Sequence, residues 1–304
     1  MGGGGTVTFA VDGVIGLTNA IVVSNNTVLD ATGHNVTISG SNAVSLFIVN
    51  PGVRLYLTNL TLADGLAQGI LVGSNYTAAL GGAICSTGMV VAVQCVFANN
   101  SAQGYVNGNP IYENPNIAQG GAIYNAGTLI LSNSVFTANL AVGGSGETWP
   151  GLSVSPGQEG SGGAIYSTGS ALIINCEMLG NVADGGQGGQ QLDNGFNNPP
   201  ASAGTNGGPA NGGAICSTGS LIVSNTTFSG NAVVGGDGGI GGAGQSTVPG
   251  GFLTAQPGNP GSQGGNPGKG NGGGICCASN DSLVVNSTLF NNSATGGNGG
   301  NGGG

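Results

Sequence analysis

The sequence has very little charge. Of 304 residues only 2 are Lys or Arg and 11 are Asp or Glu, so charged residues make up 4% and the net charge is −9. A typical soluble domain carries about 25% charged residues. The two basic residues, Arg54 and Lys269, cannot form the patch that neutralises nucleic-acid phosphates or an anionic lipid surface. The composition therefore excludes nucleic acid as a partner and leaves solvation to Asn, Ser, Thr, Gln and bare backbone.

Long apolar runs and helical periodicity are also missing. No stretch approaches the roughly 18 apolar residues of a membrane span, so we expect no membrane insertion. Met1 is followed by "GGGG" and not by a basic segment and an apolar run, so no signal peptide is visible. Hydrophobic residues still make up 38% of the chain, which is enough for a core. A charge-poor, apolar-containing chain of this kind is predicted to fold and not to be disordered.

What the chain does contain is one unit in five copies. The copy "GGAIYNAGTLILSNSVFTANLA" begins at Gly120, and the others begin at Gly81, Gly162, Gly212 and Gly272. The unit keeps its length, apart from one extra residue in the last copy, while the segments between units grow along the chain. A fixed unit with variable insertions is typical of a repeat architecture in which the insertions are loops.

Within the unit, alternating apolar residues predict strands. In "TLILS" the side chains alternate, and short apolar segments bounded by "AG" or "TG" indicate three short strands per unit. Equivalent strands of successive units can stack as parallel ladders without long crossovers. We therefore predict an all-β chain, a single right-handed parallel β-helix of about seven three-strand coils.

The predicted boundaries make residues 1–304 one β-solenoid domain. The N-terminal coils cover 6–80, and "AIVVSNNTVLDATGHNVTISG" and "SLFIVNPGVRLYLTNLTLADG" each supply a strand, a turn and a strand, with Asn25 and Asn59 at the corner. Five GGAI-type repeats cover 81–296, and a glycine-rich end covers 296–304. The insertions are 104–119, 143–161, 185–211 and 235–271.

Stacking predicts columns of identical side chains. One column holds Asn100, Asn139, Asn181, Asn231 and Asn292, and a second holds Asn133, Asn175, Asn225 and Asn286, with Gln94 in the first unit. We expect both to be corner ladders of amides that can bond to one another and to turn backbone. The apolar column Phe97, Phe136, Met178, Phe228 and Leu289 is expected in the core.

The insertions all leave the coil at one corner and contain "GGQGGQ", "GGDGGIGGAG" and "GGNGGNGGG". A Gly-Gly-x period of three suits helices of the polyproline II type, which can pair through backbone groups because glycine lets chains approach closely. Flexible glycine-rich loops are the alternative. An ordered, polyglycine-II-like layer on one face is thus one of two predictions.

The six cysteines do not have zinc-finger spacings. The register puts Cys216 and Cys276 on neighbouring coils, where they form a candidate disulfide. Cys95 and Cys176 share a position two coils apart, so we expect them to be buried and unpaired. Among the glycosylation sequons, Asn75, Asn99 and Asn291 are the candidate surface sites.

The sequence offers no catalytic constellation. The acidic residues are scattered and do not recur on neighbouring coils, as the carboxylate pairs of β-helix polysaccharide enzymes would require. The one histidine, His34, is expected to be a turn residue. We therefore predict no catalytic, cofactor-binding or metal-binding residues, no cofactor and no enzymatic activity.

The motif "GGAI" followed by "FTAN", "FSGN" or "FANN" resembles the repeat of the chlamydial polymorphic outer-membrane proteins and related bacterial surface proteins. That resemblance implies a right-handed parallel β-helix at the cell surface or outside the cell. The chain opens with "GGGGTVTF" and stops at "NGGG", which is how the last unit begins, and no capping segment is visible. We therefore expect an extracellular structural protein that stacks head-to-tail into a homopolymeric filament, or an adhesive stalk. The alternative is a pectate-lyase-like β-helix that binds or cleaves polysaccharides; glycans are candidate partners in either case.

Overall fold

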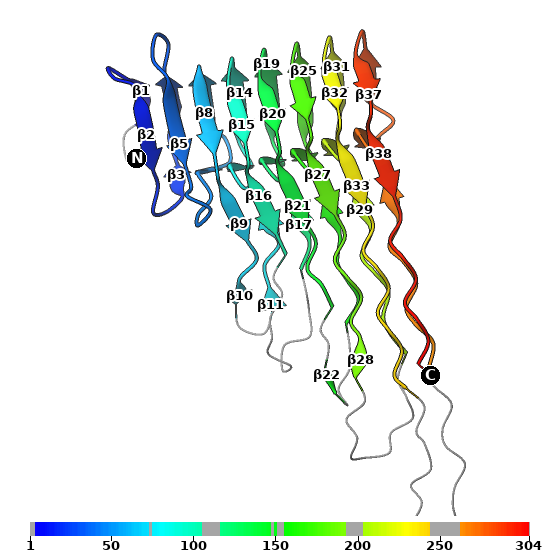
Figure 1. The fold of residues 1–304 in the computed structure, drawn as a ribbon. Helices are drawn as coiled ribbons and strands as arrows, with labels where there is room; N and C mark the ends of the chain where they lie inside the picture. Colours follow the sequence, from blue (N-terminus) through cyan, green and yellow to red (C-terminus); the bar gives the residue numbers. More distant parts are fainter. Residues whose placement is uncertain are drawn as a thin grey trace, which may run out of the picture.

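The computed structural model describes residues 4–72, 75–104, 116–146, 149–150, 155–192, 203–243 and 262–303. This part of the chain consists of strands, turns and extended segments, and it contains no helix long and apolar enough to cross a membrane. The strands form parallel sheets whose members come from successive coils, so the molecule is a stack of coils that runs from the N-terminal to the C-terminal end (Figure 1). The predicted all-β parallel solenoid is confirmed.

Five parallel sheets make up the stack. Sheet A contains β1 (Gly5–Thr8), β4 (Thr27–Asp30), β7 (Arg54–Thr58), β14 (Met89–Val93), β19 (Thr128–Ser132), β25 (Ser170–Ile174), β31 (Leu221–Ser224) and β36 (Ser282–Val285). Sheet B contains β2 (Gly13–Gly16), β5 (Val36–Ser39), β8 (Leu60–Ala63), β15 (Val96–Ala98), β20 (Val135–Thr137), β26 (Glu177–Leu179), β32 (Thr227–Ser229) and β37 (Thr288–Phe290). Sheet C contains β3 (Ile21–Val23), β6 (Phe47–Val49), β13 (Ile84–Ser86), β18 (Ile123–Asn125), β24 (Ile165–Ser167), β30 (Ile215–Ser217) and β35 (Ile275–Cys277).

Two further sheets extend the later coils, from β9 (Leu66–Gln68) onwards, beyond the central core. Sheet D contains β9 (Leu66–Gln68), β16 (Ser101–Gln103), β21 (Leu140–Val142), β27 (Val182–Asp184), β33 (Ala232–Val234) and β38 (Ser293–Thr295). Sheet E contains β12 (Ala79–Leu80), β17 (Ala118–Gln119), β23 (Gly160–Ser161), β29 (Ala210–Asn211) and β34 (Gly270–Asn271). Two small pairs complete the strands: β10 (Leu71–Val72) with β11 (Asn75–Tyr76), between β9 and β12, and β22 (Trp149–Pro150) with β28 (Gln191–Leu192), in two of the insertions.

The coil is larger than the sequence predicted. After the expected strands β18, β19 and β20, the chain adds β21 before the insertion and β23 after it, so a GGAI-type coil has five strands and not three. Sheets A and B have eight strands each, which gives eight levels where we expected about seven. The extra strands are very short and hold small residues such as the buried Ala141 and Ser161, so they lack the apolar alternation that reveals a strand in sequence.

Side chains of one column stack directly on one another. Phe97 pairs in register with Phe136, and their rings are parallel with centroids 4.4 Å apart. The same column continues through Met178 and Phe228, both fully buried. Leu289, the last member, lies in register with Phe228 but is half exposed. The predicted core column therefore exists and ends uncovered at the last coil.

The first glycine of each GGAI unit permits a sharp turn from sheet E into sheet C. Gly120 has φ 70°, a left-handed conformation that costs glycine little. A Cβ on this residue would lie 2.1 Å from the carbonyl oxygen of Ile123. The turn therefore requires glycine for both reasons, which explains why every unit begins with one.

Candidate functional site

The first asparagine column forms a continuous buried ladder where sheet B passes into sheet D. Asn139 is fully buried. Its Nδ2 donates to Asn181 Oδ1 at 2.9 Å and to the backbone oxygen of Phe97 at 3.0 Å. Its Oδ1 accepts from both the backbone N and Nδ2 of Asn100, each at 3.0 Å. One amide side chain thus satisfies two backbone groups of the preceding coil and bonds to the asparagine side chain of the following coil.

The pattern repeats at every step from Asn100 to Asn292. Asn181 donates to Asn231 Oδ1 at 2.9 Å, and Asn231 donates to Asn292 Oδ1 at 2.8 Å. The ladder begins at Gly65, whose backbone N donates to Asn100 Oδ1. Because buried polar groups are costly unless they are hydrogen-bonded, the column stabilises the corner by giving its buried amide and backbone groups partners.

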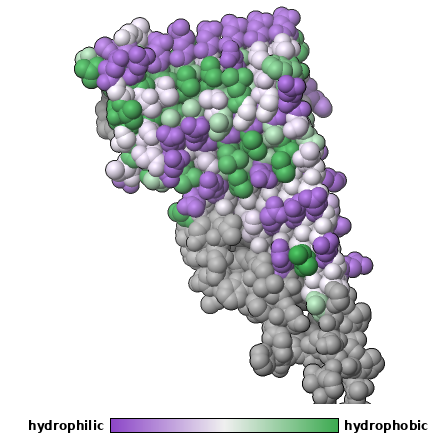
Figure 2. Space-filling model, viewed as in Figure 1, coloured by the Kyte–Doolittle hydropathy of each residue, from purple (hydrophilic) through white to green (hydrophobic). Residues whose placement is uncertain are grey.

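The second asparagine column has a different role from the one we expected. Asn133, Asn175, Asn225 and Asn286, with Gln94 and Asn59 before them, are left-handed residues with φ between 49° and 56°. They are exposed, with Asn59 only half buried, at the turn from sheet A into sheet B, and no hydrogen bond among the described residues joins two of them. The predicted amide ladder is therefore wrong here: asparagine is present because it tolerates the left-handed conformation that a one-residue turn needs. The turns form a hydrophilic rim along the top of the molecule (Figure 2).

The corner role expected of Asn25 is also wrong. Asn25 precedes β4 and has no left-handed backbone. The turn from sheet A into sheet B in that coil is the longer segment 31–35, which includes His34.

The insertions leave sheet D as extended segments and form what we call the glycine arm. It comprises the outgoing segments 143–146, 185–190, 235–243 and 296–303 and the returning segments 155–159, 203–209 and 262–269. Figure 1 shows the arm continuing beyond sheet D, with the C-terminus on it. Much of it is pale in Figure 2, as expected for residues of intermediate hydropathy.

Backbone hydrogen bonds join the segments of the arm with a period of three. Gly208 N donates to Gly186 O at 2.8 Å, Gly236 N to Gly208 O at 2.9 Å, and Gly268 N to Gly236 O at 2.8 Å, so the bonds alternate between outgoing and returning segments. Three residues further out, Gly239 N donates to Thr205 O and Gly265 N to Gly239 O, both at 2.8 Å. This hydrogen-bond pattern is that of a polyglycine-II-like layer and not that of flexible glycine-rich loops.

The contacts of the arm leave no room for side chains at the glycines. A Cβ on Gly186 would lie 2.0 Å from Gly144 O, and one on Gly236 would lie 1.9 Å from Gly186 O. In each Gly-Gly-x triplet, the residue x after the two glycines faces the surface instead. Gln187 Oε1 accepts from Asp237 N at 3.0 Å, and Asp237 Oδ1 accepts from Asn298 N and Nδ2.

The register places Cys216 directly beside Cys276, in the column that contains Cys85, Tyr124 and Tyr166 in the earlier units. All six cysteines are free thiols in the structure. Cys216 is buried and Cys276 is half buried. Each side chain is the largest influence on the pKa of the other: Cys276 raises the pKa of Cys216, and Cys216 lowers the pKa of Cys276.

A polar cluster that sequence analysis missed lies against this thiol pair. Ser161 Oγ hydrogen-bonds to Glu159 Oε1 and also interacts with the Cys216 sulfur. Asn211 Nδ2 donates to Glu159 Oε1 at 3.0 Å and to Ser161 Oγ at 3.2 Å. Ser161 and Asn211 lie in β23 and β29 of sheet E, and Glu159 directly precedes β23. These strands follow insertions of unequal length, so the only sequence signal that they share a layer is that "GS" and "AN" each directly precede a GGAI-type unit.

The other cysteines have separate environments. Cys95 and Cys176 are buried in one column, with serine or threonine on the coil that follows each: Cys95 N donates to Ser134 Oγ, and Cys176 N donates to Thr226 Oγ1. Burial raises the pKa of both thiols, to about 11 for Cys95. Cys277 is exposed next to Cys276.

The candidate glycosylation residues fall at two kinds of place. Asn99 and Asn291 are exposed left-handed residues at the corner between sheets B and D, immediately before the buried ladder. Asn75 lies in β11, and its side chain falls outside the described part of the structure.

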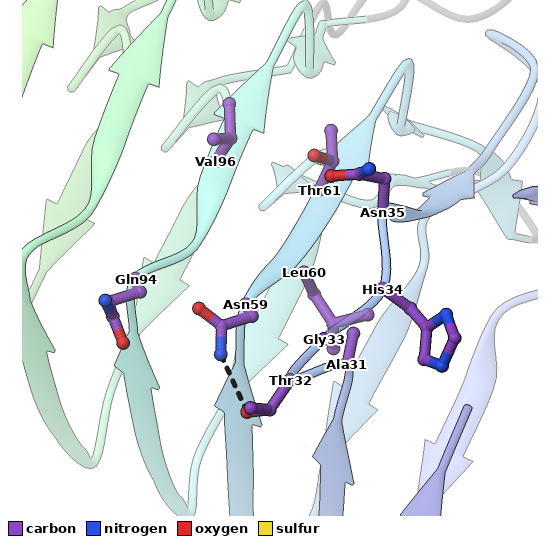
Figure 3. Close-up of a pocket in the computed structure, with 10 residues that line it drawn as sticks. All are labelled: Ala31, Thr32, Gly33, His34, Asn35, Asn59, Leu60, Thr61, Gln94 and Val96. Carbon is purple, nitrogen blue, oxygen red and sulfur yellow. Dashed lines mark hydrogen bonds between the residues drawn. The ribbon is translucent and has the colours of Figure 1, made fainter. Parts of the chain in front are cut away.

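One open pocket of about 600 Å³ lies beside the turn 31–35. Half of its ten lining residues carry amide or hydroxyl groups, namely Thr32, Asn35, Asn59, Thr61 and Gln94; the others are His34, Gly33 and the apolar Ala31, Leu60 and Val96. Figure 3 shows Asn59 and Gln94 on one side and the His34 ring on the other, with Asn59 Nδ2 bonded to Thr32 Oγ1 at 2.8 Å.

Asp12 holds His34 at the edge of this pocket. His34 Nδ1 lies 3.0 Å from Asp12 Oδ1, and Asn35 donates to the same carboxylate from its backbone N and from Nδ2. These bonds, the one from Asn35 N first, lower the pKa of Asp12. The pair is solvent-exposed and orients the turn.

Among the described residues, no group of three or more His, Cys, Asp or Glu side chains is placed to hold a metal ion. No protein-family model matches this chain, and no curated protein matches its sequence significantly.

Proposed function

We propose that this chain is a non-enzymatic structural protein of the cell surface or extracellular space, which stacks head-to-tail into a filament or an adhesive stalk. The observation that carries the proposal is that the core columns end in uncovered apolar side chains at both ends of the stack. A second copy of the chain is the occupant that fits both ends.

The C-terminal coil exposes residues that occupy core positions. Val284 lies in register with the fully buried Val223, yet it is 41% exposed. Leu289 lies in register with the fully buried Phe228, yet it is 50% exposed. Burying such a side chain contributes about 1.5–3 kcal/mol, so covering this coil is strongly favourable.

The N-terminal coil shows the same feature. Val7 pairs with the buried Leu29, and Ile15 pairs with the buried Ile38, but both are more than a third exposed. β1 and β2 are edge strands of sheets A and B, as β36 and β37 are at the other end. Placing β1 on β36 and β2 on β37 would continue both parallel sheets, cover these side chains and pair the open edges.

The test uses one blocking variant for each end. We expect the unaltered protein to form filaments visible by electron microscopy and to sediment as growing oligomers. Leu289→Asp and Ile15→Asp should each be monomeric alone. Mixed together they should give a dimer and nothing larger, because each retains one intact end that the other lacks.

Ile222→Asp is the matched control, since Ile222 is 42% exposed but lies on the outer face of β31, which β36 already covers at the C-terminal end. It should polymerise like the unaltered protein. Monomers of the unaltered protein at high concentration would overturn the proposal. Homodimers of Ile15→Asp would show tail-to-tail contact instead of head-to-tail stacking.

Binding of a neutral polysaccharide is the second candidate, favoured by the pocket lined with Asn35, Asn59 and Gln94. Side-chain amides and hydroxyls recognise sugar hydroxyl groups, and no lysine or arginine that would bind an acidic sugar lines the pocket. Retention of monomeric Ile15→Asp on immobilised neutral glycans would support this candidate independently of polymer formation.

A further inference from the structure

Cys216 and Cys276 are two thiols on directly paired strands that neither proposed function uses. Their Cα atoms are direct partners in the parallel pairing of β30 with β35. Neighbouring parallel strands lie about 4.8 Å apart, which is within the roughly 4.4–6.8 Å that separates Cα atoms in disulfides. The two side chains are close enough to be the largest influence on each other's pKa.

The environment gives the two thiols different roles. Cys216 is buried, beside Glu159, Ser161 and Tyr166. Cys276 is only half buried, so a small molecule in solution reaches it more readily than Cys216. Cys216 is the largest influence on the pKa of Cys276 and lowers it, whereas burial and Glu159 raise it.

We propose that Cys276 and Cys216 are a redox-active dithiol that reacts with small-molecule disulfides, with Cys276 as the attacking sulfur and Cys216 as the resolving sulfur. The Cys276 thiolate attacks one sulfur of the disulfide, forms a mixed disulfide and releases one thiolate. Cys216 then loses its proton to solvent, through the polar cluster of Ser161 and Glu159, and attacks the Cys276 sulfur. The second thiolate leaves, so two protein thiols are oxidised and one small disulfide is reduced to two thiols.

The product links β30 to β35 and fastens the last coil to the stack. Cys276, Cys216 and the strands they join lie at the end where Val284 and Leu289 are uncovered, so oxidation should slow amide exchange in β35 to β38. The effect does not depend on filament formation, and it can be measured on the monomeric Leu289→Asp protein.

Cys277 provides the internal control. It adjoins Cys276 in sequence and is more exposed, but burial of its sulfur raises its pKa, whereas the pKa of Cys276 is lowered. A reaction governed by exposure alone would modify Cys277 first. A reaction governed by the thiol pair should modify Cys276 first, because the thiolate is the nucleophile.

The experiment treats the reduced full chain with oxidised glutathione near neutral pH and follows it by mass spectrometry, thiol titration and peptide mapping. We expect the six free thiols to fall by two and a Cys216–Cys276 linked peptide to appear. Cys216→Ser should stop at one glutathione adduct on Cys276. Cys276→Ser should lose the linked peptide and slow thiol consumption about tenfold.

Cys277→Ser and Cys85→Ser are the matched controls and should form the linked peptide at the rate of the unaltered protein. First modification at Cys277, or a stable glutathione adduct on Cys276 while Cys216 is intact, would overturn the proposal. Circular dichroism of each variant verifies that the coil stack is retained.

Discussion

The two asparagine columns use the same residue in the same repeat for different physical reasons. Asn139 is fully buried and joins three coils through its side-chain amide. Asn133, six positions earlier in the unit, is exposed, and its side chain reaches only Ser132. The first column needs asparagine for the hydrogen bonds of its side chain. The second needs it for its backbone conformation, which is left-handed, with φ 50° at Asn133. Recurrence of a residue in a solenoid therefore indicates a shared position but not a shared interaction.

The largest effect is expected from Asn139→Ala. The change removes the acceptor for Asn100 N and Nδ2 and the donor to Phe97 O, all within a buried corner. Leaving buried polar groups without partners costs about 1–3 kcal/mol each, so we expect a loss of about 4 kcal/mol in the free energy of unfolding. Urea denaturation followed by circular dichroism measures it. A loss below about 1 kcal/mol would show that water replaces the amide and that the ladder contributes little to the free energy of unfolding.

The stacking register could be predicted from sequence because the unit has a fixed length. Counting from the first glycine places Phe97 on Phe136 and Cys216 on Cys276, and the sheets have these pairings. The period of three in the insertions likewise indicated backbone pairing between glycine segments, as Gly208 and Gly236 show.

Other features could not be predicted, because they depend on where variable segments return. Glu159 meets Cys216 only after an insertion has left the coil and come back, and no period in the sequence fixes that path. The fourth and fifth strands were missed because residues such as Ala141 and Ser161 are too small to mark a strand. The distinction between the asparagine columns was missed because sequence records neither φ nor burial.

A smaller effect is expected from Asn133→Ala, the matched change in the exposed column. No buried partner is lost, but alanine tolerates the left-handed conformation less well than asparagine does, at a cost of about 1 kcal/mol. The same urea denaturation should therefore give about a quarter of the loss seen for Asn139→Ala. Equal losses in the two variants would mean that the exposed side chain has an interaction of comparable strength, and the contrast between the columns would fail.

The smallest effect, and the only gain, is expected from Ala138→Gly. Ala138 is exposed and has φ 51°, in a corner column where Gly180 and Gly230 occupy the next two coils. Glycine adopts this conformation without the steric cost that alanine pays, although it loses more backbone entropy on folding. We expect a net stabilisation of about 0.5 kcal/mol, measured as a higher urea midpoint with an unchanged slope. Ala98→Gly, a half-buried alanine in β15 without a left-handed backbone, is the control and should destabilise the protein. If both changes destabilise it, strain at Ala138 is not significant, and the exposed corner tolerates any small residue.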